Sequence, residues 1–198
     1  MSSQNYNKKA SLINETFANL RQNFIFTVSA FALLAGCTNA YSEKAQQPEI
    51  ITDANIAAIV VGANNIDISA GKIALGRSKN ASVKKFAERM VTDHTAVLNS
   101  AVALVTRLGV TPVNNELVAT LAEQSNKHEA NLSTLSGNAF DRSYIDHEVA
   151  YHEAVIGVIE NQLIPSAQNK ELKGMLVSVV PAFRAHLEHC QMIQTQIQ

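Results

Sequence analysis

Three histidines and one aspartate interrupt the apolar faces of the helical segments in this chain. Counted in alternating steps of three and four residues, Asp67 is the only charge on the apolar face of the first segment. The same count puts His94, His152 and His186 on the apolar faces of three later segments. Carboxylates and imidazoles bind Zn, Fe, Cu and Ni, so the pattern predicts a transition-metal site without choosing among these metals.

Other residues of suitable chemistry lie close to these four in the sequence. We expect four of them to contact the candidate ligands and hold them in position without binding the metal: Asp93, Asp141, Tyr144 and Cys190. Cys190 follows His186 by one helical turn and is better explained as a small buried apolar thiol than as a ligand. Buried histidines commonly bond to carboxylates or tyrosines, so a polar core network without metal remains the alternative.

Catalytic chemistry has little support in the sequence. No phosphate-binding loop or nucleophile elbow is present, and we predict no catalytic residue. Ferritin-type iron chemistry needs several inward carboxylates, and the pattern supplies one, Asp67. His128, His147 and His189 fall off the apolar faces and are expected at the surface.

The elements that must hold these side chains are helices. Apolar periodicity and stop signals predict helices over about 52–78, 80–108, 116–135, 138–163 and 168–193. Four long helices and one short helix, joined by short connections, predict an all-α antiparallel four-helix bundle of the ferritin-like kind with one extra helix. Turns near 79 and 167 would bring the four candidate ligands to levels roughly 5 to 6 Å apart within each helical hairpin.

The segment before the bundle reads as an export signal. An apolar run at 24–36 follows Lys8, Lys9 and Arg21, and its 13 residues are too few to span a bilayer. Leu34-Ala35-Gly36-Cys37 resembles the cleavage site of bacterial lipoproteins, and this resemblance implies an acylated Cys37 anchored in a membrane.

The resemblance also suggests a location and a domain plan. Thr38 is not the aspartate that retains such lipoproteins at the inner membrane, which implies the outer membrane, on its periplasmic side. We expect a signal peptide at 1–36, a lipidated cysteine and flexible tether at 37–51, and one bundle domain at 52–198. The whole chain has a formal net charge of −1, so nucleic acid is not an expected partner.

Several short stretches resemble the bacterial envelope family catalogued as domain of unknown function 4142. They are Asp67-Ile68-x-x-Gly71-Lys72-x-Ala74, Phe86-Ala87-x-x-Met90-Val91-x-Asp93-His94, Phe140-Asp141-x-x-Tyr144-Ile145 followed by His152, and Pro181 followed by His186-Leu187. The family pattern usually has glutamate where this chain has Asp67. The resemblance implies a ferritin-like helical bundle and supplies no established activity.

Two functions of different classes follow from the sequence. The first is a lipid-anchored envelope protein that binds a metal ion through a mid-bundle cluster of Asp67 and three histidines. The second is a non-enzymatic structural or interaction protein whose buried polar network only specifies packing and whose outer faces bind envelope components. Enzymatic activity is not predicted by either.

Overall fold

The computed structural model describes residues 50–197, and this part of the chain forms one compact helical unit. Its main helices are α2 (Asp53–Arg77), α3 (Ala81–Arg107), α4 (Glu116–Ser133), α5 (Gly137–Val158) and α7 (Lys170–Gln196). Residues 50–197 contain no strand, which confirms the predicted all-α bundle. The predicted signal peptide, Cys37 and nearly all of the tether lie outside the described residues.

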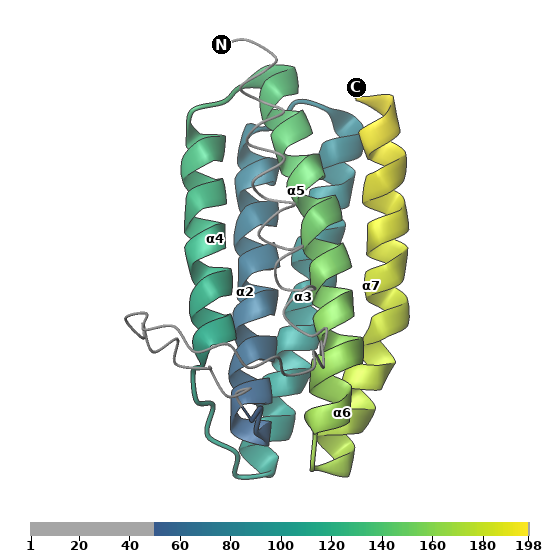
Figure 1. Ribbon diagram of the computed structural model, residues 1–198. Coiled ribbons are helices and arrows are strands. Elements are labelled where there is room, and N and C mark those ends of the chain that lie inside the picture. Colours follow the sequence, from purple (N-terminus) through teal and green to yellow (C-terminus); the bar gives the residue numbers. More distant parts are fainter. Residues whose placement is uncertain (1–49, 198) are drawn as a thin grey trace, which may run out of the picture. The chain divides into compact units, whose positions relative to one another are not determined.

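Four helices enclose the core, and the fifth lies at one side. Helix α2 packs against α3 and α5, and α7 packs against the same two helices. Helix α4 lies beside α2, as Figure 1 shows, and also contacts α5. The short extra helix predicted from sequence is therefore α4, and it covers one outer side of the four-helix arrangement.

Side-chain caps explain where most helices begin. The side chain of Thr52 accepts a hydrogen bond from the Asn55 amide, and the Asn55 side chain accepts one from the Thr52 amide. Asn80, Asn115 and Asn169 cap α3, α4 and α7 in the same way, each accepting from backbone N–H groups of the first turn. These caps satisfy amide groups that have no partner inside a helix.

The end of α5 differs from the prediction. Instead of stopping at Leu163, the chain forms a π-helical turn, η1 (Ile159–Leu163), and continues through α6 (Ile164–Ser166). Pro165 lies in the first turn of α6, where its missing N–H group is not needed. The widened π-helical turn thus lets the helix run past a proline that was expected to end it.

The core consists of two apolar clusters separated along the bundle. One contains Ile56, Ile59 and Phe183, and the other contains Ala74 and Phe86. The stretch of α2 between them carries buried polar side chains. Helix α2 is long and apolar enough to cross a membrane, but more than half of that stretch is buried inside the bundle, as in the core helix of a soluble domain.

Candidate metal centre

Three imidazoles meet between the two apolar clusters. His94 of α3, His152 of α5 and His186 of α7 are each at most 2% exposed. Their ring centroids lie 5.3 to 5.7 Å apart. One nitrogen of each ring lies within 4.8 Å of a nitrogen of each of the other two. Helices far apart in the sequence therefore bring three ligand-type nitrogens to one buried point.

Each of these rings uses one nitrogen for a hydrogen bond that holds its orientation. His94 Nδ1 lies 2.9 Å from the Asn64 side-chain oxygen, and His152 Nδ1 lies 2.9 Å from the Glu148 carbonyl oxygen. His186 Nε2 lies 2.8 Å from Asp93 Oδ2. All three partners accept hydrogen bonds, so these ring nitrogens carry the protons.

The other nitrogen of each ring is left with a lone pair. Nε2 of His94, Nε2 of His152 and Nδ1 of His186 are buried and have no hydrogen-bond partner. An imidazole whose far nitrogen donates to an oxygen while its near nitrogen is free is the usual arrangement of a metal-binding histidine.

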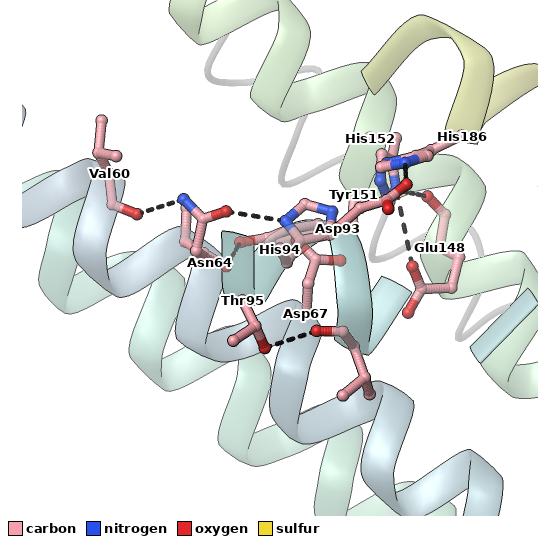
Figure 2. A network of polar contacts seen from close by, with 12 residues as sticks. Val60, Asn64, Asp67, Asp93, His94, Thr95, Glu148, Tyr151, His152 and His186 are labelled. Atoms are coloured by element: carbon pink, nitrogen blue, oxygen red, sulfur yellow. Dashed lines mark hydrogen bonds and ion pairs between the residues drawn. The ribbon is translucent and has the colours of Figure 1, made fainter. Parts of the chain in front are cut away.

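The Asn64 amide is itself fixed in place. Its nitrogen donates to the Val60 carbonyl oxygen at 2.7 Å, which leaves the amide oxygen facing His94 (Figure 2). Phe183 stacks against the other side of the His94 ring with centroids 4.9 Å apart. The ring is thus held by one polar contact and one apolar contact.

Burial keeps the three imidazoles neutral. It lowers the pKa of His152 to about 4 and holds the pKa of His94 well below its usual range. Burial also lowers the pKa of His186, partly offset by the bond to Asp93. Neutral imidazoles at pH 7 are ready to bind a metal without first losing a proton.

Two buried carboxyl groups lie next to the histidines. Asp67 Oδ2 is 3.5 Å from His94 Nδ1, and Glu148 Oε2 is 3.6 Å from His152 Nδ1. Burial raises the pKa of Glu148 to about 8, and burial together with the Glu148 charge raises the pKa of Asp67. Asp67, Glu148 and His152 form a second group with donor atoms within 4.8 Å of one another.

Comparison with known families gives a match over most of the chain. Residues 38–193 match the family described as a domain of unknown function (DUF4142). The chain belongs to the DUF4142 family. The resemblance inferred from the sequence is thereby confirmed, while no curated protein and no solved structure matches the chain significantly.

The four predicted ligands of this DUF4142 domain do not form one donor set. The three histidines share a group, whereas Asp67 lies with Glu148 and His152 and does not join the other two histidines. Asp67 faces His94 Nδ1, the nitrogen that bonds to Asn64, and not the free nitrogen. The sequence count identified the level and the face of Asp67, but it could not resolve which side of an imidazole the carboxylate meets.

The predicted supporting residues have different surroundings. Asp93 contacts His186, and Tyr144 lies one turn before Glu148 on α5 with its hydroxyl buried and unpartnered. Cys190 is a buried free thiol that contacts the Leu187 carbonyl oxygen, and burial raises its pKa. Asp141 is buried near the start of α5, three turns from His152, and belongs to neither donor group.

Two residues of the candidate site were not predicted from the sequence. Glu148 is 1% exposed, so the expectation of a single inward carboxylate was wrong. Its position four residues before His152 put it on the same face of α5 and was the available signal. The signal for Asn64 was weaker: it is a polar side chain three residues before Asp67 in a very apolar helix.

Two histidines expected at the surface are buried. His128 of α4 and His147 of α5 are each 7% exposed, and their rings stack with centroids 3.6 Å apart. The physical reason is α4, which covers one side of α5 and creates an interface outside the four-helix core. The count in steps of three and four residues finds only the faces that meet inside a four-helix bundle, so it could not predict this outer interface.

Proposed function

We propose that this domain binds a transition-metal ion, with His94, His152 and His186 as its protein ligands. The observation that carries the proposal is the meeting of these three buried histidines, each of which has one ring nitrogen without a hydrogen-bond partner. Buried polar atoms are nearly always satisfied, and each exception calls for an explanation. Here three of the exceptions lie on imidazole rings that three helices bring to one buried point, and one cation bound by these rings would account for them.

A polar network that only specifies packing accounts for less of the geometry. It explains the hydrogen bonds from the rings to Asn64, Asp93 and the Glu148 carbonyl. It gives no role to the three opposite nitrogens, which neither pair with one another nor reach a carboxylate. Neutral imidazoles with oxygen partners behind them favour metal binding over packing alone.

The donor set limits the metals and the coordination. Three imidazoles suit Zn, Cu, Fe and Ni better than Mg or Ca. Three protein ligands leave a tetrahedral ion with a fourth position for water or a small ligand, as in catalytic rather than structural zinc sites. We therefore propose a bound ion that remains available to a small molecule.

Thermal melting of metal-free protein tests this function. A ligand that binds only the folded state stabilises it by about 2.7 kcal/mol at a concentration of 100 times Kd. Adding Zn, Cu or Ni should therefore raise the Tm of the wild type in a concentration-dependent way. His94→Ala, His152→Ala and His186→Ala should each abolish the response, because each variant removes one of three ligands.

His128→Ala is the matched control for these variants. It removes a buried histidine of α4 that belongs to neither donor group, so it should lower stability and retain the metal response. Equal melting curves with and without each metal, on protein verified as metal-free by elemental analysis, would contradict the proposal.

The proposed setting of the site is the cell envelope. The signal-like segment and Cys37 suggest a lipid-anchored protein, with the outer membrane, facing the periplasm, as the compartment implied by Thr38. An anchor of this kind would hold the metal-binding domain near the bilayer and in contact with the ions of the periplasm.

A further inference from the structure

We infer that the carboxylates of Asp67 and Glu148, next to His152, form a second cation position beside the three-histidine position, making the centre suited to two ions. This inference rests on the proposed function and extends it. The three residues supply donor atoms within 4.8 Å of one another, and each residue is at most 3% exposed. His152 lies in both groups, so the two positions are neighbours, but its Nδ1 bonds to the Glu148 carbonyl oxygen and its one free nitrogen is left for the first ion.

Unpartnered buried atoms mark this second position independently of the first. Both carboxylate oxygens of Glu148 are buried without a hydrogen-bond partner, and so is the Tyr144 hydroxyl. Tyr144 precedes Glu148 by one turn on α5, and the two groups are close enough for the Glu148 charge to raise the Tyr144 pKa. The Tyr144 hydroxyl and the Asp67 carboxyl lie beside these Glu148 oxygens, and a cation between Asp67 and Glu148 would satisfy them more fully than these neighbours do.

The carboxylates are separated from the first position by the imidazole rings. They approach Nδ1 of His94 and Nδ1 of His152, whereas the free nitrogens of these two rings are Nε2. An ion on the free nitrogens is thus held by neutral ligands and keeps its full charge. When a second ion displaces their protons, Asp67 and Glu148 supply two negative charges, which match one further divalent ion and offset its repulsion from the first.

The two positions differ in donor chemistry and therefore in the ions they prefer. Nitrogen donors suit Zn, Cu and Ni, whereas carboxylate and hydroxyl oxygens suit harder ions such as Mn²⁺. The geometry therefore points to a mixed centre, with a borderline metal on the histidines and a harder divalent ion on the carboxylates.

A sequential titration tests the second position in the full-length protein. Metal-free protein is loaded with one equivalent of Zn²⁺ and titrated with Mn²⁺, and bound Mn²⁺ is followed by loss of the free-ion electron paramagnetic resonance signal. Elemental analysis after dialysis counts both metals. We expect one Mn²⁺ per chain in addition to one Zn²⁺.

Variants separate the two positions. Glu148→Gln and Asp67→Asn should weaken Mn²⁺ binding at least tenfold and retain Zn²⁺, whereas His186→Ala should lose Zn²⁺ and retain Mn²⁺. Glu153→Gln, an exposed change on the same helix, should bind both metals like the wild type. Melting curves of the metal-free variants verify that each one is folded.

The outcomes distinguish this inference from the proposed function. Zn²⁺ binding without Mn²⁺ binding in the wild type would overturn the second position alone. Unchanged Mn²⁺ binding in both carboxylate variants, or loss of Mn²⁺ in His186→Ala, would also overturn it, because Mn²⁺ would then be using the histidines. Binding of neither metal would overturn the proposed function as well.

Discussion

Asn64 decides which nitrogen of His94 is free. Its side-chain oxygen accepts from His94 Nδ1, and its nitrogen is committed to the Val60 carbonyl. An amide cannot ionise, so the Asn64 oxygen remains a hydrogen-bond acceptor for His94 at every pH. A neutral acceptor of this kind fixes the ring and its tautomer without adding charge to the site.

Asn64→Leu tests this role at the scale of one residue. Leucine has a similar volume but accepts no hydrogen bond, so His94 should lose its preferred tautomer. Loss of such a partner usually costs 10- to 100-fold in metal affinity, and we expect Kd for Zn²⁺ to rise by about that factor. Competition with a chromogenic chelator measures it.

The control for Asn64→Leu is Asn131→Leu. Asn131 donates to Ser143 between α4 and α5, away from both donor groups, so its loss should lower stability without changing metal affinity. If Asn64→Leu binds Zn²⁺ like the wild type, the hydrogen bond to His94 does not orient a ligand.

Residue chemistry in this chain was only partly predictable from the sequence. His94, His152 and His186 interrupt apolar faces, and periodicity alone was sufficient to bring them together. Glu148 was not predicted because only Asp67 was counted as an inward carboxylate, although Glu148 lies four residues before His152 on one face of the same helix. Asn64 and the separation of Asp67 from the free nitrogens depend on side-chain rotamers, which a helical count does not contain.

Helices α2 and α3 pack closely against each other at Gly71. A Cβ atom there would lie 2.9 Å from Val91 Cγ2 and 3.1 Å from the Ala87 carbonyl oxygen. The oxygen belongs to the backbone of α3 and cannot rotate away, so any side chain must push the two helices apart. Asp67 and His94 lie about one turn from this contact on the same two helices.

Gly71→Ala should therefore destabilise the domain and weaken the metal site together. Overpacking of this kind typically costs 1 to 3 kcal/mol, and we expect a loss of about 2 kcal/mol in the free energy of unfolding by urea titration. Gly76→Ala is the control in the same helix, because its Cβ would meet nothing within 4 Å. Gly76→Ala should be neutral or slightly stabilising, because alanine favours the helix more than glycine does. A Gly71→Ala variant as stable as Gly76→Ala would show that contact with α3 does not exclude a side chain at Gly71.

The elements themselves were well predicted, because their signals are local. Asn80, Asn115 and Asn169 cap their helices through contacts within three residues, and such contacts are visible in the sequence. The π-helical turn before Pro165 was not predictable in this way, since it depends on how η1 packs against α7. The burial of His128 and His147 likewise depends on α4 docking, a tertiary event.

The anchor determines where the whole molecule acts. We predict that Cys37→Ser prevents lipidation and moves the protein from the membrane fraction to the soluble fraction, because the tether after it has no apolar surface to hold a bilayer. Fractionation in high salt, followed by immunoblotting, measures the change. A serine variant that is still processed and still sediments with membranes would contradict the lipoprotein prediction.

The stability of the metal-free protein should pass through a maximum as the pH changes, because buried histidines and a buried carboxyl group titrate with opposite effects. Burial lowers the pKa values of His128 and His152 to about 4 from 6.5, so the unfolded chain binds more protons below pH 6.5 and stability falls as the pH falls. Burial raises the pKa of Glu148 to about 8 from 4.5, so the folded chain binds more protons in that range. The stability of the folded protein therefore falls as the pH rises from 4.5 through 8, where Glu148 loses its proton in the folded state.

The Tm of metal-free protein should consequently peak near pH 6.5, where the histidine contribution is complete and the loss from Glu148 is still growing. Each titrating group changes the free energy of unfolding by at most about 1.4 kcal/mol per pH unit, or roughly 3 °C in Tm for a domain of this size. Glu148→Gln should flatten the alkaline limb, and His128→Ala should flatten part of the acid limb. Glu153→Gln, an exposed change, should reproduce the wild-type profile. An alkaline limb that persists unchanged in Glu148→Gln would contradict the prediction, because the pKa of this carboxyl group would then not be raised in the folded protein.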